Sequence, residues 1–443
     1  MKIKNKKLTV LFISPFDLVP ERFWGPTLRL FMLAKELTAK GHEVYLLGPA
    51  PFNRTVPKEM DGVKLITFRS RFYRYDYAGI ERQTAKAANP RLFKALAVPG
   101  LRWLELEWLV TRLKPDFMVV NRAFPETGFP ALLSHFLRGI PLIYDWDDLE
   151  GLHGFSTNYM VSLPSQLFVT VTELVWARFS SVTLVASRFL EELALKIWVD
   201  RKRVVYAPTV ADTARFHPGV NGEEIRKKFG LAGKTVLLYT GNLEHGNGVK
   251  TENILYVTAL LAATRPGIRL LVVGGGSLLQ HGAEEGALPR LVRDLDIQDK
   301  VIFTGNINYS DVPNYIAAAD ICLALFPINV ITMAKSPLKI YEYMAMGKPV
   351  VARAVGEIPG AIQDGHNGFL VFSDNPREYA DKINQALENK DNLQKIGAKA
   401  RETVEQRLSW RHSAETLLDA FAVADEVKSS HGRFFKKAIQ PRR

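Results

Sequence analysis

Short apolar runs alternate with helix-like segments along most of this chain. Turn residues bound each run, and the segments between the runs have apolar residues at helical spacing. This alternation is typical of parallel βαβ units, whose strands are buried on both faces. In the first half of the chain the predicted strands are residues 9–14, 43–47, 117–121, 141–145, 182–186 and 203–206.

Two of the intervening helices have recognisable ends. Residues 28–41 end at Gly41, a residue type that often follows a helix in the left-handed conformation. Residues 187–197 begin at Ser187, whose hydroxyl suits the N-cap position. Strands and helices in this order predict a doubly wound parallel sheet.

The pattern pauses in residues 211–234, which are rich in glycine and contain no strand signal, so we place a domain boundary there. The strands predicted after it are residues 235–240, 269–273, 300–304, 320–326, 349–352 and 368–372. The predicted fold class is therefore α/β, with two Rossmann-like, doubly wound parallel-sheet domains facing each other across a cleft. The predicted domains are residues 1–214, residues 215–410, and residues 411–443, the last a helix that crosses back to the first domain and a basic tail.

The composition narrows the class of protein. Hydrophobic residues make up 47% of the 443 positions, enough for two sizeable cores. A formal net charge of +12 favours an anionic partner, such as a phosphorylated substrate, an anionic membrane surface or nucleic acid. The single cysteine, Cys322, excludes an intramolecular disulfide and indicates a reducing compartment.

The start of the chain does not resemble a secretory signal. Its first residues are basic, but the apolar stretch that follows is broken at Pro15 and Asp17 and lacks a small-residue cleavage site. No run of about 18 apolar residues is free of charges, so we expect no membrane-spanning helix. These features predict a cytoplasmic protein.

The segment of residues 335–352 carries the most specific local chemistry. Ser336 suits an N-cap, Pro337 suits the first helical position, and Gly347 suits the end of the helix. The N-terminus of such a helix offers unpaired N–H groups and partial positive charge to a phosphate. Lys339 lies in its first turn, where a cation opposes the helix dipole, and Glu342 shares its face. A bound diphosphate would explain the lysine; the alternative is an ordinary Lys339–Glu342 ion pair.

Residues 342–351, Glu-Tyr-Met-Ala-Met-Gly-Lys-Pro-Val-Val, resemble the carboxyl-terminal half of the signature of the family 4 retaining glycosyltransferases, which have the two-domain GT-B fold. Further segments fall in the order of that family: residues 41–44, 114–116, 185–190, 216–218, 272–276 and 318–321. The resemblance covers roughly residues 8–410. It implies a sugar nucleotide as the donor substrate and no cofactor or metal ion.

The resemblance also implies roles for individual residues. Glu342 would bind the ribose hydroxyls of the donor. The diphosphate would be held by the start of the helix, at Ser336, Pro337, Leu338 and Lys339.

Residues from other loops complete the implied donor site. Gly25 resembles a glycine that approaches the diphosphate from the first domain, unless it is a plain turn glycine. Gly275 would let the chain pass close to the nucleotide, although a purely structural turn explains it equally well. Asn306 falls where family members contact the base, and Asn242 is included where they have a diphosphate-binding arginine.

The chain departs from the family at three of its charged positions. Ala334 replaces a sugar-contacting glutamate, Asn242 replaces an arginine, and Asn247 replaces a lysine. Lys339, with Lys335 and Lys250 nearby, would then have to compensate the diphosphate charge. We favour an active enzyme in which Lys339 acts as that cation.

Asp145 and Asp147, after a predicted strand, have the spacing by which another glycosyltransferase fold holds a divalent metal. The signature in the second domain contradicts that fold, so we predict no metal site. We expect one of Asp145, Asp147 and Asp148 to contact the transferred sugar or the acceptor hydroxyl; the alternative is that they cap the loop. His153 is a weaker candidate for the same surface.

We therefore predict a retaining glycosyltransferase that moves a sugar from a UDP- or GDP-linked donor to a hydroxyl of a lipid-linked or cell-surface glycan precursor. Basic and aromatic residues interleave in residues 69–114, and with residues 160–176 they favour peripheral binding to an anionic membrane, unless these helices simply pack on the sheet. Nucleic acid is disfavoured because no binding motif accompanies the charge. The alternative functions are a sugar-nucleotide-binding protein without turnover and a sugar-nucleotide epimerase.

Overall fold

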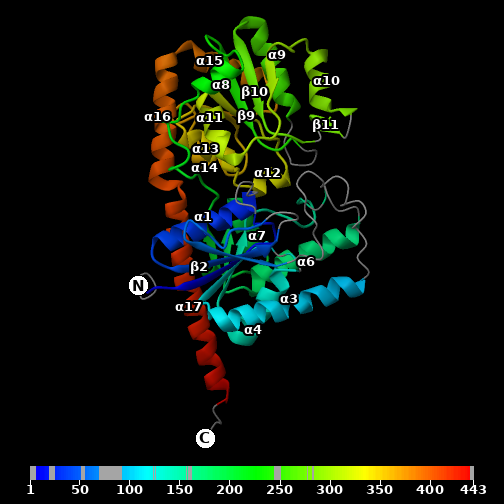
Figure 1. Cartoon of the computed structure of the whole chain (residues 1–443), viewed down its shortest axis with the longest axis vertical. Helices are drawn as coiled ribbons and strands as arrows, with labels where there is room; N and C mark the ends of the chain where they lie inside the picture. Colours follow the sequence, from blue (N-terminus) through cyan, green and yellow to red (C-terminus); the bar gives the residue numbers. More distant parts are fainter. Residues whose placement is uncertain are drawn as a thin grey trace. The chain divides into compact units, whose positions relative to one another are not determined.

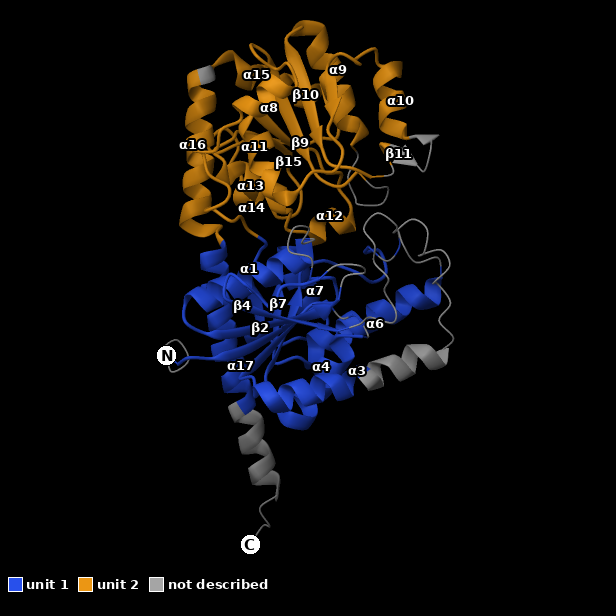
Figure 2. Ribbon diagram, viewed as in Figure 1, with its two compact units in different colours: residues 1–209, 410–443 blue, residues 210–409 orange. Residues whose placement is uncertain are grey.

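The computed structural model contains two compact units, residues 1–209 with residues 410–443, and residues 210–409 (Figure 2). We call them unit 1 and unit 2. The boundary therefore follows Thr209, whereas the predicted boundary followed Ala214. The structure describes residues 6–18, 25–50, 55–68, 92–122, 124, 126–155, 157, 162–243, 251–276, 278–281 and 284–439.

The sheet of unit 1 has eight strands in the order β3-β4-β2-β1-β5-β6-β7-β8, all parallel except β3. Figure 1 labels β2 in this sheet and the helices α1, α3, α4, α6 and α7 of the same unit. The strands are β1 Thr9–Ile13, β2 Glu43–Pro49, β3 Glu59–Met60, β4 Val63–Phe68, β5 Phe117–Asn121, β6 Leu142–Trp146, β7 Val182–Val185 and β8 Val204–Tyr206. All six strands predicted for this half are present. The sequence pattern missed β3 and β4 because they lie at the sheet edge, where polar, partly exposed residues interrupt the apolar run.

The helices of unit 1 are α1 Gly25–Ala39, α3 Leu92–Leu113, α4 Gly128–Arg138, α6 Leu163–Phe179, α7 Arg188–Lys196 and α17 Trp410–Ile439, with a 3₁₀ turn at Arg201–Arg203. Ser187 caps α7 as predicted, because its hydroxyl accepts a hydrogen bond from the Leu190 N–H. The terminal helix α17 packs on α1 and on β6, β7 and β8, and Phe421 stacks on Phe117 with ring centroids 4.4 Å apart.

The main sheet of unit 2 has six parallel strands in the order β13-β10-β9-β14-β15-β16. They are β9 Thr235–Thr240, β10 Ile268–Val273, β13 Val301–Phe303, β14 Ile321–Ala324, β15 Val350–Arg353 and β16 Phe369–Val371, and a small hairpin is formed by β11 Gln280–His281 and β12 Glu284–Glu285. All six strands predicted for the second half are present in this sheet. Its buried leucine, isoleucine and valine side chains form one core with the helices around it.

The described helices of unit 2 range from 4 residues in α14 to 18 residues in α16. They are α8 Glu223–Lys228, α9 Glu252–Thr264, α10 Ala287–Asp294, α11 Val312–Ala317, α12 Val330–Ala334, α13 Leu338–Ala345, α14 Ile358–Ala361, α15 Pro376–Glu388 and α16 Lys390–Arg407, with a 3₁₀ turn at Tyr309–Asp311. Among the described residues, no helix is both long enough and apolar enough to cross a bilayer.

Both main sheets are doubly wound, so each has a point where the strand order reverses. The reversal lies between β1 and β5 in unit 1 and between β9 and β14 in unit 2. Open α/β sheets bind ligands beyond the carboxyl ends of the strands at such a point. The predicted α/β class with two Rossmann-like sheets is therefore confirmed, and the cleft between the domains stays a prediction.

Candidate functional site

Helix α13 begins close to the strand-order reversal of unit 2, but not with the cap that the sequence suggested. Its N-cap residue is Pro337, and no side chain caps this end. The Ser336 hydroxyl lies instead 3.1 Å from the Tyr341 hydroxyl, inside the unit. The prediction that Ser336 is the N-cap is therefore wrong. Pro337 offers no side-chain acceptor to the amides of the first turn, which leaves them suited to an anion.

Lys339 lies in the first helical turn, and its ammonium group packs on aromatic rings. The Nζ atom is 3.9 Å from the ring centroid of Tyr239, at the end of β9, and 5.5 Å from that of Phe326. Burial lowers the pKa of Lys339 to about 7, and the neighbouring charge of Glu342 only partly opposes that shift. The structure therefore shows a partly buried lysine whose ammonium group is packed on aromatic rings.

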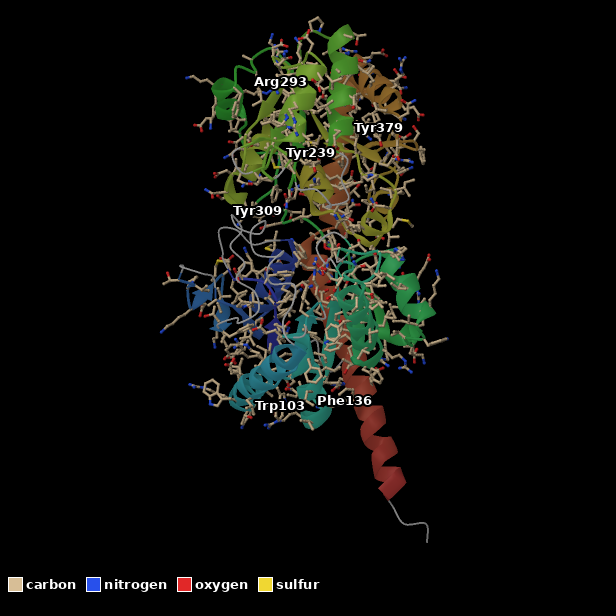
Figure 3. The ribbon with its side chains drawn as sticks, turned by 90° about the vertical axis from the view of Figure 1, so that its right-hand side faces the viewer. Trp103, Phe136, Tyr239, Arg293, Tyr309 and Tyr379 are labelled. Atoms are coloured by element: carbon tan, nitrogen blue, oxygen red, sulfur yellow. The ribbon has the colours of Figure 1, made fainter. Side chains whose placement is uncertain are left out.

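Glu342 lies on the same face of α13 and is almost completely buried. Its Oε1 atom accepts a hydrogen bond of 2.6 Å from the Tyr309 hydroxyl. Burial raises the pKa of Glu342 to about 7, while the Tyr309 hydrogen bond and the charges of Lys339 and Arg215 act in the opposite direction. The Tyr309 ring in turn contacts the guanidinium of Arg215 at 5.1 Å from its centroid. Figure 3 labels Tyr309 and Tyr239 in this unit.

Glycines bring the loops after β9 and β10 close to this pair. Gly241 follows β9, and a side chain there would begin 2.5 Å from the Lys339 Nζ atom. Gly274 follows β10 with a φ of 138°, and a Cβ at this position would collide with the Gly241 carbonyl oxygen. Both glycines have positive φ values, which favour glycine. The loop after β9 therefore lies next to Lys339, and the loop after β10 lies against that loop.

The remaining predicted donor-site residues of unit 2 surround these loops. Gly275 lies against Asn306, since an added Cβ would be 2.6 Å from its Oδ1 atom, and Asn306 itself is exposed after β13. Asn242 is exposed directly after Gly241. Leu338 is the first residue of α13 and is partly buried. The structure thus collects Asn242, Gly275, Asn306, Pro337, Leu338, Lys339 and Glu342 from separate loops at the carboxyl ends of the unit 2 strands.

Sequence reasoning missed three neighbours of the pair, Tyr239, Tyr309 and Arg215. None of the three could be identified from its spacing to other residues in the sequence, because each lies on a different segment of the fold. Tyr239 looked like one more core residue of an apolar strand, and only its ring contact with Lys339 distinguishes it. Asn247 and Lys250, which the sequence singled out, lie outside the described residues.

Asp145 lies at the end of β6 in unit 1 and is sealed inside the protein. Its carboxylate accepts hydrogen bonds from the Arg29 guanidinium at 2.9 to 3.1 Å and from the Asn121 Nδ2 atom at 3.0 Å. Arg29, on α1, also donates to the Ala207 carbonyl at 2.8 Å. Burial raises the pKa of Asp145, and the Arg29 charge opposes the shift. Asp145 is 0% exposed, so it does not reach the surface where a sugar would bind.

Arg122, directly after β5, holds the neighbouring carboxylates. Its guanidinium pairs with Asp147 at 3.0 Å, with Asp148 at 2.6 Å and with Glu150. The two aspartates of the metal-like spacing are thus bonded to two different arginines. Among the described residues, no group of three histidine, cysteine, aspartate or glutamate side chains is arranged to hold a metal ion. Neither aspartate acts as the predicted loop cap in these contacts.

Two further candidates belong to unit 1. Gly25 is the first residue of α1, and the space beside its Cα atom is open, since an added Cβ would meet nothing within 4 Å. His153 is exposed and has a left-handed backbone, with a φ of 67°. No contact among the described residues of unit 1 distinguishes a ligand role for either residue. Residues 69–91 and 160–161, parts of the two segments predicted to bind a membrane, lie outside the described residues.

The fold and the grouping at α13 together define a class, the two-domain Rossmann-like proteins of GT-B architecture. The solved structure of HepE from Anabaena, in complex with UDP and glucose, is similar with a TM-score of 0.69 at 18% identity, over 94% of this chain and 99% of that chain. Sucrose-phosphate synthase from Thermosynechococcus elongatus is similar with a TM-score of 0.66 at 19% identity, over 97% and 100% of the two chains.

Sequence comparisons lead from the class to the family. Residues 25–209 match the model of the glycosyl transferase 4-like domain, and residues 221–403 match that of the glycosyl transferases group 1. A D-inositol 3-phosphate glycosyltransferase from Actinosynnema mirum is 32% identical over 70% of this chain and 73% of its own length. The chain belongs to the group 1 glycosyltransferase family, as the resemblance implied.

Other relatives match over shorter segments. A D-inositol 3-phosphate glycosyltransferase from Nocardia farcinica is 31% identical over 51% of this chain and 48% of its own length. A GDP-mannose-dependent alpha-(1-6)-phosphatidylinositol monomannoside mannosyltransferase from Mycobacterium tuberculosis is 30% identical over 48% and 54% of the two chains. The chain spans about half the length of the first relatives that it matches, with 48%, 52% and 51% covered.

Proposed function

We propose that the protein transfers a sugar from a nucleoside diphosphate donor, bound at the start of α13, to an acceptor hydroxyl with retention of configuration. The observation that carries the proposal is the Lys339–Glu342 pair. A lysine desolvated on the Tyr239 ring, in the first turn of a helix without a side-chain cap, is unfavourable until an anion binds. A diphosphate supplies that anion.

In this proposal Lys339 and the first amides of α13 hold the two phosphates, and Glu342 accepts hydrogen bonds from the ribose hydroxyls. When the bond between sugar and phosphate breaks, negative charge grows on the leaving diphosphate. A prealigned ammonium group and helix dipole stabilise this charge in a site that excludes water. The role needs no metal ion, because the cation is part of the chain.

Asn242 and Gly275, which directly follow Gly241 and Gly274 at the strand ends, are proposed to line the donor site, with Asn306 toward the base. Gly25 is proposed as the contribution of unit 1 to the diphosphate. Because Asp145 is buried and bonded to Arg29, we assign it and Asp147 a positioning role beneath the acceptor surface and no contact with substrate.

For the acceptor we propose a hydroxyl on a polar head group that is attached to a lipid or becomes part of a surface glycan. The relatives named for D-inositol 3-phosphate and for a phosphatidylinositol mannoside support this class of acceptor. We accordingly place the protein in the cytoplasm, at the inner face of the membrane. UDP and GDP both remain donor nucleotides to be tested.

A second function, donor binding without transfer, is favoured by one observation. Ala334, which replaces the family's sugar-contacting glutamate, is 0% exposed, so it offers neither charge nor hydrogen bond to the donor. This second function predicts the same nucleotide binding as the first and differs only in turnover. The two are separated by one set of measurements.

The test is thermal unfolding of the full chain with UDP, GDP and ADP, followed by a donor-consumption assay with the matching sugar nucleotides. A nucleotide at about 100 times its dissociation constant should add about 2.7 kcal/mol of stability. The variant Glu342→Gln should weaken this shift, while Glu388→Gln, on the distant helix α15, should not. Consumption of the donor with an added acceptor supports transfer, and a shift without any consumption supports the second function. No shift with any of the three nucleotides would reject both.

A further inference from the structure

Helix α13 is joined to the end of strand β9 by a hydrogen bond that no local sequence pattern indicates. The Tyr343 hydroxyl lies 2.7 Å from the Thr240 backbone nitrogen, so the phenol oxygen accepts a hydrogen bond from that N–H group. It also lies 2.9 Å from the Thr240 hydroxyl. Both residues are buried, and they are 103 residues apart in the chain. The function proposed above does not use this contact.

The described strands of unit 2 leave the Thr240 N–H group without a strand partner. On one side of β9, β10 runs alongside as far as Thr240, and its Val273 carbonyl accepts from the next residue, Gly241, at 2.9 Å. On the other side, the register of β14 reaches only Leu237 and Leu238. A buried N–H group without an acceptor is costly, so the phenol oxygen takes the place of a neighbouring strand.

Tyr343 lies one helical turn after Lys339, so the two side chains leave α13 on the same side. Lys339 contacts the residues before and after Thr240. Its Nζ atom lies 3.9 Å from the ring centroid of Tyr239, and a Cβ added at Gly241 would be 2.5 Å from it. Two side chains of α13 thus meet three consecutive residues at the carboxyl end of β9. Figure 1 labels both elements in unit 2.

The place of the Lys339 ammonium group depends on how α13 lies on β9. The lysine side chain is a flexible stem of four carbons, and among the described residues its Nζ atom has ring contacts but no hydrogen bond or ion pair. Glu342 joins α13 to the 3₁₀ turn at Tyr309 and not to β9. The described hydrogen bonds between α13 and β9 are therefore those of the Tyr343 hydroxyl.

From this geometry we propose that Tyr343 is a positioning residue of the donor site, whose hydroxyl fixes α13 on the end of β9 and so holds the Lys339 ammonium group beside the Gly241 backbone. The hydroxyl is buried and does not touch the donor. It acts through Lys339, whose ammonium group has to be in place before charge grows on the leaving diphosphate. The inference rests on the proposed function for its ligand, but the placement of Lys339 is measurable without one.

A purely structural role of Tyr343 makes a different prediction. Loss of the hydroxyl would then lower stability and leave the Lys339 ammonium group where it is, because the ring still fills the core. The protonation of Lys339 separates the two roles. Burial beside Tyr239 and Phe326 lowers its pKa to about 7, and the charge of Glu342 opposes that shift. An ammonium group released toward solvent regains a higher pKa.

The first measurement is the titration of Lys339 in the full-length protein without any ligand. Competitive labelling with acetic anhydride over a range of pH, read by mass spectrometry on the peptide that contains Lys339, gives the pH of half-maximal labelling. The variant is Tyr343→Phe, which removes only the hydroxyl. The matched control is Thr258→Val, which removes a buried hydroxyl of α9 that donates to the Ile254 carbonyl at 2.8 Å.

We expect half-maximal labelling of Lys339 near pH 7 in the unaltered protein and in Thr258→Val. In Tyr343→Phe it should lie about one pH unit higher, because the ammonium group is no longer held on the rings. Both variants should unfold cooperatively in urea, which shows that the change does not come from unfolded protein.

The second measurement is a double-mutant cycle on turnover, with whichever of UDP-glucose and GDP-mannose the unaltered protein consumes. Tyr343→Phe should lower turnover about 10- to 100-fold, because a displaced ammonium group stabilises the leaving diphosphate poorly. In the Lys339→Met background the same change should cost less than about threefold, since the group through which it acts is gone. Thr258→Val should leave turnover unchanged in both backgrounds.

Two results would overturn the inference. One is a pH of half-maximal Lys339 labelling that is the same in Tyr343→Phe as in the unaltered protein. The other is an equal loss of turnover from Tyr343→Phe with and without the Lys339 ammonium group. If neither sugar nucleotide is consumed, the proposed transfer is rejected, and the labelling result still decides whether Tyr343 places Lys339.

Discussion

The carboxyl ends of the two main sheets carry charged side chains in contrasting states. In unit 1 the charges bond to one another, Arg29 to Asp145 and Arg122 to Asp147. In unit 2 Lys339 lies over an aromatic ring, and the pKa values of Lys339 and Glu342 are both displaced to about 7. Unit 1 thus holds a closed ionic cluster at the carboxyl end of its sheet, whereas unit 2 holds a lysine and a glutamate whose pKa values are both displaced.

This difference indicates which of the two groups of charged residues binds a ligand. A buried ion pair whose hydrogen bonds are made holds elements together and has nothing left to offer a substrate. A group kept in its disfavoured protonation state costs stability, and such costs concentrate at functional sites. We therefore infer that the unit 1 cluster stabilises the fold and that the unit 2 pair binds the donor.

The largest expected effect follows from breaking the unit 1 cluster. Arg29→Met leaves the buried Asp145 carboxylate without its guanidinium partner. Loss of one member of a buried pair costs about 3 to 5 kcal/mol, so the free energy of unfolding in urea should fall by that amount. The double variant Arg29→Met with Asp145→Leu should recover much of the loss. A fall of less than about 1 kcal/mol for the single variant would mean that the pair does not support unit 1.

The second-largest effect is expected from a change of Lys339, and Lys348, just beyond the other end of α13, provides the comparison. Lys339→Met keeps the apolar stem but removes the ammonium group, so turnover should fall about 100- to 1000-fold, as when one prealigned donor is lost. Stability should stay the same or rise, because the desolvated charge disappears. Donor consumption and thermal unfolding measure the two outcomes.

Lys348→Met is the matched control. The Lys348 Nζ atom donates to the carbonyls of Ala317 and Ala319, each at 2.8 Å. Its loss should lower stability by about 1 to 3 kcal/mol, since buried carbonyls lose their donor, and leave the turnover of folded protein unchanged. Similar turnover in the two variants would contradict the role of Lys339.

The strands were predictable from the sequence because buried parallel strands are continuous apolar runs between turn residues. All twelve predicted strands are present. Four strands were missed: β3 and β4, at an edge where the pattern is interrupted, and the two-residue strands β11 and β12 of the small hairpin. Helix α4 lies between two predicted strands, where the pattern predicts a helix, but apolar residues in a short segment do not reveal whether they face the core or solvent.

The site was only partly predictable. Lys339 and Glu342 share a helix, so their spacing alone placed them on one face. Tyr309 reaches Glu342 from 33 residues away, and Arg29 reaches Asp145 from 116 residues away. No local pattern encodes such contacts, and for that reason Asp145 looked like a surface ligand. The Ser336 cap failed because Tyr341 offers its hydroxyl a buried partner.

A smaller effect is expected from the hydrogen bond that orients Glu342. Tyr309→Phe removes the hydroxyl that donates to Oε1 at 2.6 Å. A hydrogen bond to a charged group contributes about 1.5 to 3 kcal/mol, so donor affinity should fall at least about tenfold while turnover at saturation changes little. Tyr315→Phe, a buried tyrosine that packs on Phe229, is the control and should keep full affinity. Unchanged affinity in Tyr309→Phe would remove Tyr309 from the site.

The smallest effect is a pH dependence of donor binding that comes from the same pair. Burial lowers the pKa of Lys339 to about 7, so above that pH the free site holds a neutral lysine, and binding a diphosphate must take up a proton. Donor affinity should therefore weaken about fivefold between pH 7 and pH 8. Burial raises the pKa of Glu342 to about 7, so the carboxylate is lost, and ribose binding weakens, as the pH falls below that value.

Affinity should thus pass through a maximum near neutral pH, with apparent pKa values that belong to the coupled pair. Calorimetry in buffers of different ionisation enthalpy measures both the affinity and the proton uptake. Glu342→Gln should keep only the weakening at high pH, and Lys339→Met only the weakening at low pH. If the donor affinity of the unaltered protein does not change with pH around neutrality, neither Lys339 nor Glu342 titrates there, and the contrast with the ion pairs of unit 1 is wrong.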